Sequence, residues 1–349
     1  MNALRIAALC VVTLSGSGCA LLNAAKNGDP MAAAREADKI RQLGADSQKH
    51  AETKCAPLKD GEVGFNEERA IGGVVGVELI SKNGHLYLEG ITEKNPETLN
   101  KNLEDKKPVT LPDGAINDLT AYVSVVGKNL ARYSARPDLP WTFAVIKNDS
   151  VNAFSAPGGY VVVTTALLKK ITNEAQLAGV LGHEIGHVVL KHSLKKYQDA
   201  KHKQCIAANY AAYLVSHGGP KSAATDVVAG YAQKFDGQLD LDKEKDVGFI
   251  KFIMEMVTNL LQLGNDKQAE LDTDKTSLEL ISFAGYDAAE YEKFLATLDE
   301  GGTLVPAHPS LKDRIAALKG LREGELAPFA VGTAKPDTAK MFAPMTAAK

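Results

Sequence analysis

The chain has 349 residues, of which 45% are hydrophobic and 24% are charged, and its formal net charge at pH 7 is −3. This composition is typical of a globular protein with one sizeable domain and appendages, and the lack of a strongly basic block argues against nucleic acid as a partner. No run of eighteen apolar residues without a charge follows residue 30, so we expect no transmembrane helix in the mature protein.

The chain begins with a predicted export signal over residues 1–18. A positive residue, an apolar core and a run of small residues that ends at Cys19 are typical of such signals in bacteria. Cys19 resembles the lipidated first residue of a mature lipoprotein. Ala20 follows it, as is typical of lipoproteins sorted to the outer membrane. Gly16, however, stands where lipoproteins usually carry leucine. We therefore expect a lipid-anchored protein on the periplasmic side of the envelope. The alternative is a soluble periplasmic protein.

Residues 19–60 are predicted to form a lipid tether followed by a helical segment, because they are rich in Ala, Lys and Glu. Since Cys10 and Cys19 belong to the signal, Cys55 and Cys205 are the cysteines of the mature body. A pair of cysteines in an oxidising compartment is compatible with one disulfide. Two separate thiols are the alternative, because nothing in the sequence places the two residues together.

Regular hydrophobic patterns follow, first of the helical and then of the strand type. A helix that ends in a turn at Asn83-Gly84 is predicted within residues 65–90, and a polar loop within 91–113. The next predicted elements are a helix over 115–133, a strand over 141–147, and a strand over 160–164 after a turn at 157–159.

The most informative element is a predicted helix over 173–194 that contains the motif H-E-I-G-H. Its two histidines, His183 and His187, are four residues apart and lie on one helical face, where both imidazoles can bind a single Zn²⁺. Glu184 between them can take a proton from a zinc-bound water, which is the equipment for hydrolysing a peptide bond. A buried helix whose histidines have this spacing by chance is the alternative interpretation.

The predicted helix also has a candidate N-cap and two glycines in its interior. Asn173 or Thr172 can cap its N-terminus. Gly182 and Gly186 are unusual inside a helix, because each costs about 1 kcal/mol relative to alanine. They are explained if another backbone packs closely against that face of the helix.

Residues 196–268 are a possible lid or insertion. Within them an amphipathic helix is predicted over 248–263. Core packing is the usual role of such a helix, and a mobile lid over the active site is the alternative.

Beyond this segment, Glu270 and Asp274 are four residues apart and share one helical face. Glu270 is therefore a candidate third zinc ligand, and Asp274 is a candidate partner that orients a ligand histidine. An exposed acidic helix turn is the alternative. Asp272 is a rival ligand, but it would point away from the face of Asp274.

Four ordered blocks over about residues 115–320 carry a resemblance to a known family. They are the hairpin over 151–160, the H-E-x-x-H motif, Glu270 with Asp274, and the H-P-S-L-K-D-R-I block over 308–315. The chain resembles metallopeptidase family forty-eight, the HtpX-like gluzincins related to the CAAX prenyl protease, and within it periplasmic lipoproteins of the BepA/LoiP type. Thr273 stands where the family commonly has alanine.

The resemblance implies roles for the matching polar residues. Glu270 would be the third zinc ligand, and Asp274 would support the metal shell. His308 would face the metal, either as a regulatory extra ligand or as a donor to the tetrahedral oxyanion. Arg314 would hold the segment of His308 in place.

The resemblance also implies where a substrate binds and leaves several histidines without a role. An extended peptide would pair by main-chain hydrogen bonds with the strand formed by Asn152, Ala153, Phe154 and Ser155. His192 has poor spacing for the same metal and is expected at the surface near the helix end. Other histidines outside the motif are expected to be incidental, namely His50, His85, His202 and His217.

The expected fold is α+β, a mainly helical gluzincin domain over 61–325 with a small β-sheet or hairpin beside the zinc helix, followed by a disordered tail over 326–349. The expected function is a zinc endopeptidase, with one Zn²⁺ per chain, that cleaves unfolded or misassembled polypeptides of the bacterial envelope. The alternative is a chaperone-like, client-binding protein whose zinc site is self-inhibited by His308. A structural zinc site is poorly supported, because two histidines and a carboxylate leave a coordination position open.

Overall fold

The computed structural model describes residues 26–27, 29–87, 118–219, 221–235, 248–249, 252–253, 267–299 and 311–329. The elements in chain order are α3 (Pro30–Lys59), α4 (Phe65–Asn83), β1 (His85–Leu86), α6 (Asp118–Ala131), β2 (Thr142–Lys147), β3 (Ala153–Ala156), β4 (Tyr160–Thr164), α7 (Thr165–Lys170), α8 (Glu174–Val189), α9 (His192–Ser216), α10 (Ala223–Gly230), the 3₁₀ helix η1 (Ala232–Phe235), α12 (Lys267–Phe283), α13 (Ala289–Asp299) and α14 (Leu311–Glu323). None of the helices in this part of the chain is long and apolar enough to cross a membrane.

The chain divides into two compact units. The first comprises residues 1–67 with 195–252, and the second comprises 68–194 with 253–349. The predicted insertion therefore groups with the N-terminal segment over most of its length. The amphipathic helix predicted over 248–263 lies largely outside the described residues.

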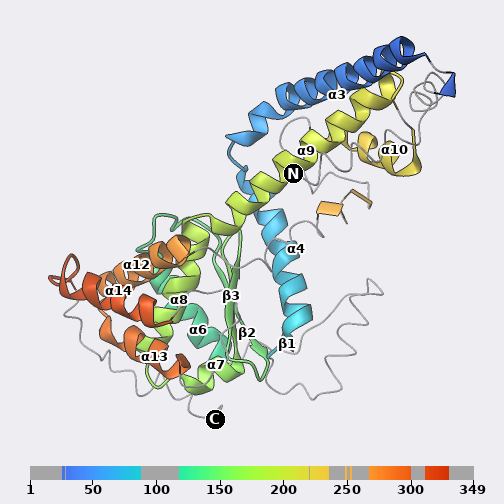
Figure 1. Ribbon diagram of the computed structural model, residues 1–349. Coiled ribbons are helices and arrows are strands. Elements are labelled where there is room, and N and C mark those ends of the chain that lie inside the picture. The colour runs from blue at the N-terminus through green and yellow to red at the C-terminus, as the bar shows by residue number, and fades with distance from the viewer. Residues whose placement is uncertain are drawn as a thin grey trace, which may run out of the picture. The chain divides into compact units, whose positions relative to one another are not determined.

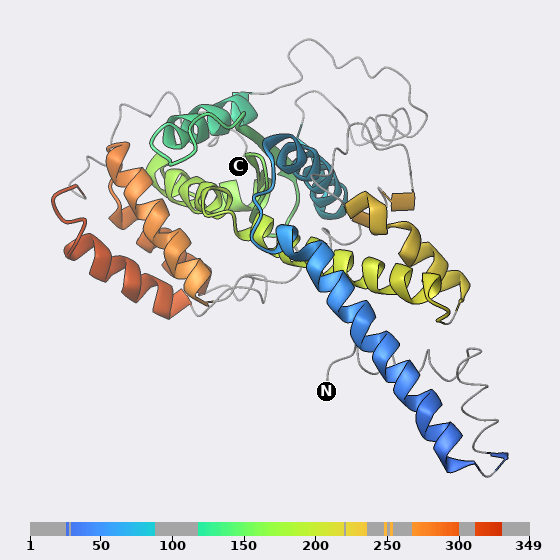
Figure 2. The ribbon, with the colours of Figure 1, turned by 90° about the horizontal axis from the view of Figure 1, so that it is seen from above.

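In the second unit the sheet lies between helices on both of its faces (Figure 1 and Figure 2). α4 runs along one face, α6 and α8 lie against the other, and α12, α13 and α14 lie beyond α8. The ring of Tyr160 in β4 packs over Gly73 and Gly76, so α4 approaches the strand closely. The predicted α+β class, mainly helical with a small sheet beside the motif helix, is confirmed.

The sheet has the strand order β1-β2-β4-β3. β2 and β4 are parallel, with Thr142 opposite Tyr160, whereas β3 runs antiparallel to β4, with Ala153 opposite Val163. The predicted strand over 160–164 is present with those bounds, and β2 begins one residue later than predicted. β3 is an edge strand among the described strands, because it pairs with β4 alone.

α8 carries the H-E-I-G-H motif and is buried along almost its whole length. Asn173 is its N-cap and accepts a hydrogen bond from the backbone N–H of Gln176 at 2.9 Å. The first helical residue, Glu174, accepts hydrogen bonds from the hydroxyls of Tyr122 at 2.6 Å and Tyr286 at 2.7 Å. The start of α8 is therefore fixed on α6 and on the segment before α13.

The prediction that another backbone packs against the glycines of this helix is confirmed, and the partner is α12. A Cβ on Gly182 would meet the Cα and carbonyl oxygen of Ser277 at 3.4 Å. A Cβ on Gly186 would meet the carbonyl oxygen of Thr273 at 3.2 Å. The close approach of α12 is what brings its carboxylates to the histidines of α8.

In the first unit, α3 and α9 lie side by side in antiparallel directions (Figure 1), and the rings of His50 in α3 and Tyr213 in α9 contact each other. Cys55 of α3 and Cys205 of α9 form a disulfide. Glu67 at the start of α4 is buried and accepts hydrogen bonds from Lys201 at 2.8 Å and from the hydroxyl of Tyr197 at 2.6 Å. A buried carboxylate needs such partners, because an unpaired charge in a protein interior is costly.

Only the first residues of the tail predicted over 326–349 are among the described residues. Leu326, the first apolar residue of the predicted tail, is buried with an exposed fraction of 5%, and its backbone N–H donates to the carbonyl of Leu321. Residues 330–349 lie outside the described part of the chain.

Candidate metal centre

Three side chains from two helices converge at the middle of the second unit. The Nε2 atoms of His183 and His187 in α8 are 3.1 Å apart. The carboxylate of Glu270 in α12 lies 3.4 Å from Nε2 of His183 and 3.5 Å from Nε2 of His187. All three residues are buried, with exposed fractions of 5%, 8% and 0%.

These separations fit a tetrahedral zinc ion. Ligand atoms at tetrahedral corners about 2.0–2.2 Å from a metal lie about 3.3–3.6 Å from one another. The two Nε2 atoms are 3.1 Å apart, and each lies near a different oxygen of Glu270, His183 at 3.4 Å from Oε2 and His187 at 3.5 Å from Oε1, which is close to this range. Two imidazole nitrogens and one carboxylate oxygen are also the ligand types that catalytic zinc sites use, with the fourth position left open.

Asp274 and Arg314 form a buried ion pair behind His183. Oδ1 of Asp274 is 2.9 Å from Nδ1 of His183, on the side of the ring opposite the Nε2 atom. Arg314 of α14 donates from Nε to Oδ2 and from Nη2 to Oδ1 of Asp274, both at 2.7 Å. The hydroxyl of Tyr291 in α13 donates to the same Oδ1 at 3.2 Å. Three helices thus fix one ring.

The charges in this group set its pKa values. Burial by itself raises the pKa of Asp274, but hydrogen bonds from Arg314 and His183 outweigh burial and lower the pKa to about 2. Burial and the charge of Arg314 lower the pKa of His183, but hydrogen bonds to Asp274 and Glu270 outweigh them and raise the pKa to about 9 in the metal-free protein. Asp274 is therefore a carboxylate at neutral pH and a strong acceptor for the Nδ1 proton of His183.

Asp272, the rival candidate ligand, points away from the cluster of His183, His187 and Glu270, as expected. It is exposed, and its carboxylate accepts a hydrogen bond from Gln268 at 2.8 Å on the outer face of α12. Glu184, the residue after the first histidine, is buried with an exposed fraction of 7%. The exposed acidic turn that was the alternative for Glu270 and Asp274 is excluded, because both are buried.

His192 lies just after the end of α8, as expected, but it is half-buried and contacts His187. Its Nδ1 atom lies 3.0 Å from Nδ1 of His187. The hydroxyl of Thr273 lies 3.3 Å from Nδ1 of His187 and 3.4 Å from Nδ1 of His192. Thr273 and Tyr291 were also missed as neighbours of the ligands. The spacing of His192 gave no signal, because five residues along a continuous helix point to a different face.

The edge of β3 offers a row of backbone groups. The backbone N–H of Thr164 donates to the carbonyl of Asn152 at 3.1 Å, so these opposed residues form a hydrogen-bonded pair. Hydrogen-bonded and non-hydrogen-bonded pairs alternate along an antiparallel ladder. Phe154 therefore also turns its backbone groups toward β4, whereas Ala153 and Ser155 turn theirs to the open edge.

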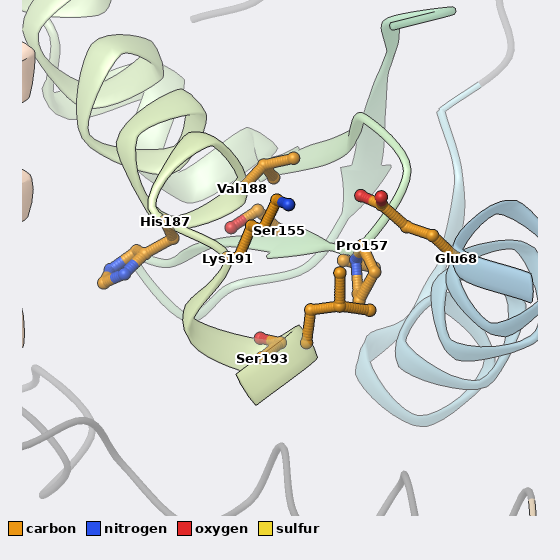
Figure 3. Close-up of a pocket in the computed structure, with 9 residues that line it drawn as sticks. Glu68, Ser155, Pro157, His187, Val188, Lys191 and Ser193 are labelled. Carbon is orange, nitrogen blue, oxygen red and sulfur yellow. The ribbon is translucent and has the colours of Figure 1, made fainter. Parts of the chain in front are cut away.

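A small pocket joins the end of β3 to the metal helix (Figure 3). Ser155 and Pro157 line it on the hairpin side, and His187 and Lys191 line it at the end of α8. The other lining residues are Glu68, Ala156, Val188, Ser193 and Leu194. His187 of the motif and Ser155 of β3 therefore line the same hollow, and the imidazole of His187 points away from the other labelled residues (Figure 3).

Glu68 and Arg136 hold the hairpin to the end of the metal helix. Glu68 accepts hydrogen bonds from the backbone N–H of Gly158 at 2.9 Å and from both terminal nitrogens of Arg136 at 2.9 and 2.7 Å. Arg136 also donates to the carbonyl of Val188 at 3.2 Å, one residue after His187. The turn needs glycine, because φ of Gly158 is 78°.

Two residues of the predicted site, Cys19 and His308, lie outside the described residues. The proposed lipid attachment and the proposed plug or oxyanion donor therefore stay predictions. Arg314 was predicted to hold the segment of His308, and this also stays a prediction; within the described part of the chain Arg314 contacts Asp274.

Comparisons with known proteins match this part of the chain. The family model described as Peptidase family M48 matches residues 117–322. The chain is 26% identical over 230 residues to the beta-barrel assembly-enhancing protease of Escherichia coli (strain K12), covering 62% of this chain and 42% of that protein. It is 40% identical over 95 residues to the mitochondrial metalloendopeptidase OMA1 of Schizosaccharomyces pombe, covering 27% of this chain and 28% of that protein.

A third relative is the putative beta-barrel assembly-enhancing protease of Vibrio cholerae, which is 25% identical over 211 residues. This match covers 57% of the chain and 39% of the relative. The chain thus spans less than half the length of the curated relatives that it matches.

Proposed function

Because the chain belongs to peptidase family M48, we propose that it is a zinc-dependent endopeptidase of the bacterial cell envelope that hydrolyses unfolded or misassembled proteins. The observation that carries the proposal is the buried convergence of His183, His187 and Glu270. This ligand set would hold one Zn²⁺ per chain and would leave one position open for water or substrate.

Glu184 is the proposed general base. A bound Zn²⁺ would supply a Lewis acid and lower the pKa of a water molecule toward neutrality. Glu184 takes a proton from the attacking water and delivers it to the nitrogen of the leaving amine, while the water oxygen enters the new carboxylate and the peptide C–N bond breaks. No acyl-enzyme forms, because water and not a side chain is the nucleophile.

The proposed substrate site is the open edge of β3. An extended peptide would pair with the outward backbone groups of Ala153 and Ser155, and Ser155 lines the same pocket as His187. Asn152 and Phe154 belong to the same strand, but their backbone groups face β4 and their part is to keep the edge in register. Backbone pairing recognises extended chains irrespective of sequence, which suits unfolded polypeptides as substrates.

Asp274 and Arg314 are proposed to orient His183. The carboxylate of Asp274 accepts the Nδ1 proton, which leaves the Nε2 lone pair of His183 directed at the metal. Arg314 keeps the carboxylate ionised and fixed by two hydrogen bonds.

The location and the substrate class are proposed from the N-terminal signal and the relatives. Residues 1–18 have the pattern of an export signal, and Cys19 would attach a lipid that anchors the protein at the outer membrane on its periplasmic side. The Escherichia coli relative is named for enhancing β-barrel assembly. Envelope polypeptides that fail to assemble are therefore the proposed substrates.

The test of this function is cleavage of unfolded casein by the mature protein, with and without a chelator, beside the variant Glu184→Gln. We expect the zinc-loaded wild type to cleave casein and the chelated sample to lose activity, which re-added Zn²⁺ restores. Glu184→Gln should bind zinc as the wild type does but lose at least about 100-fold in rate, because it has no base. Cleavage that persists in the variant or in chelator would refute the mechanism.

A further inference from the structure

The two ligand histidines are supported by different chemical groups. His183 has the carboxylate of Asp274 at its Nδ1 atom, whereas His187 has the imidazole of His192 at 3.0 Å. We propose that His192 is a positioning residue whose Nδ1 lone pair accepts the Nδ1 proton of His187 and so fixes the tautomer and the ring plane of that ligand. This inference rests on the proposed zinc site.

The proton positions follow from the neighbouring distances. Nε2 of His187 faces the other two ligand atoms, at 3.1 Å from His183 and 3.5 Å from Glu270, so this nitrogen must offer a lone pair to the metal. A neutral imidazole carries its proton on the other nitrogen, which makes Nδ1 of His187 a donor. Nδ1 of His192 lies 3.0 Å from that nitrogen and can accept its proton.

Thr273 does not take the place of His192. Its hydroxyl donates to the carbonyl of Ala269 at 2.7 Å, which uses its single proton. The hydroxyl oxygen lies 3.3 Å from Nδ1 of His187, farther than His192 does. Thr273 can therefore serve only as a weaker second acceptor. Since Nδ1 of His192 accepts, the proton of His192 sits on Nε2.

The break between α8 and α9 allows the imidazoles of His187 and His192 to contact each other. Five residues along an unbroken helix turn the chain by about 500°, which places residue 192 about 140° away from residue 187. α8 ends at Val189, Leu190 is its C-cap, and Lys191 takes the left-handed conformation with φ of 58°. α9 begins at once with His192. This reversal brings the ring of His192 back to the ring of His187, with centroids 5.3 Å apart.

The experiment measures zinc affinity and ligand geometry instead of cleavage alone. In His192→Phe an aromatic ring is kept and the acceptor is lost, while in His192→Asn a side-chain oxygen can accept in place of the nitrogen. His202→Phe is the matched control, because His202 lies on the same helix α9 but belongs to the first unit. Each variant is titrated with zinc against a chromophoric chelator, and the cobalt-substituted protein is examined by visible absorption.

We expect His192→Phe to bind zinc about 10–100-fold more weakly than the wild type and to shift the cobalt spectrum. His192→Asn should recover part of the affinity, and His202→Phe should bind as the wild type does. Nitrogen-detected NMR of the zinc-loaded wild type should show the proton of His192 on Nε2. Wild-type affinity and an unchanged cobalt spectrum in both His192 variants would overturn the proposal.

The same measurements separate this inference from the proposed function. A wild type whose zinc affinity depends on His192 but that cleaves no casein would refute the peptidase and leave the role of His192 standing. A wild type that cleaves casein while both His192 variants keep its zinc affinity would refute the role of His192 alone. A wild type that binds no zinc would refute both. If His192→Phe fails to fold, the affinity of His192→Asn and the NMR assignment still decide the question.

Discussion

Arg314 is the residue on which the charge balance behind the metal ligands depends. It is buried with an exposed fraction of 3%, and Asp274 beside it is exposed by only 1%. Its guanidinium donates two hydrogen bonds to Asp274 and one to the hydroxyl of Tyr291. Removing one partner of a buried ion pair leaves the other charge without compensation, which is far costlier than never having had the pair.

Arg314→Met should therefore destabilise the protein by about 3–5 kcal/mol and weaken zinc binding, because Asp274 no longer holds His183. Arg314→Lys should recover only part of this loss, since an ammonium group lacks the planar fork. Thermal unfolding and chelator competition give the two readouts. Arg322→Met is the control on the same helix, where loss of the ion pair with Glu292 should cost at most about 1 kcal/mol. Equal effects of the two Met variants would contradict this account.

A second prediction concerns Lys191. Among the described residues it is the non-glycine residue whose φ is positive. Lys191→Gly relieves a backbone strain of about 1–2 kcal/mol in the folded state. It also raises the conformational entropy of the unfolded state, which costs up to about 1 kcal/mol, so the free energy of unfolding should stay level or rise slightly. Lys191→Val should cost about 1–3 kcal/mol, because a β-branched residue tolerates this conformation poorly. Denaturant unfolding measures both. A Val variant as stable as the wild type would show that the turn is not needed.

Whether the role of a single residue can be predicted depends on how much of the evidence for it lies in the neighbouring sequence. His183 and His187 could be predicted because helical spacing alone puts them on one face. Glu270 and Asp274 needed the family resemblance in addition, since acidic residues four apart are common on exposed helices. The position of His192 could not be predicted, because it depends on the backbone conformation of Lys191, which a lysine in the sequence does not indicate.

At the scale of elements, the glycines of α8 set how closely the neighbouring helices approach. A Cβ on Gly179 would lie 2.4 Å from Cδ2 of Tyr291, and that ring is buried and hydrogen-bonded to Asp274. Gly320 in α14 has no neighbour within 4 Å of such a Cβ. The same substitution should therefore have opposite effects at the two sites.

We expect Gly179→Ala to destabilise the protein by about 1–3 kcal/mol, because overpacking outweighs a gain of about 1 kcal/mol in helix propensity. Gly320→Ala should stabilise it by about 0.5–1 kcal/mol. Thermal unfolding of both variants compares the two signs directly. If both alanines stabilised, the contact between α8 and α13 would be looser than the structure indicates.

The sequence predicted that some backbone packs on Gly182 and Gly186, but not that α12 supplies it. The two glycines indicate that another segment packs closely against the helix, but they do not identify that segment, since many segments could pack there. The strands were predictable because a run of β-branched residues over 161–164 follows a glycine turn. The role of Glu68 could not be predicted, because its partners Arg136 and Gly158 are far away in the sequence.

At the scale of the whole molecule, the grouping of residues 195–252 with residues 1–67 could not be predicted. It rests on contacts between residues that are distant in the chain, such as the disulfide between Cys55 and Cys205, which are separated by 150 positions. Periodicity identifies each helix but says nothing about which helix it packs against. The possible lid within 196–268 thus stays a prediction.

The attachment of the whole protein to a membrane is tested at Cys19. In cells fed a labelled fatty acid, the wild type should take up the label and sediment with membranes, and Cys19→Ser should take up none. Cys10→Ser is the control, because this residue lies inside the predicted signal and should not alter labelling. An unlabelled wild type released into the soluble periplasmic fraction would favour the alternative of simple signal cleavage.

The disulfide between Cys55 and Cys205 closes a covalent ring that contains β3 and both ligand histidines, whereas Glu270 lies outside it. One cut at any peptide bond within the ring opens it but releases no fragment. A peptidase is exposed to cutting by other copies of itself, and such a nicked molecule would keep its mass until a reductant separated the pieces. Self-digestion would therefore escape detection in unreduced samples. If the cut lay between residues 187 and 205, reduction of the disulfide would also separate the two histidines from Glu270.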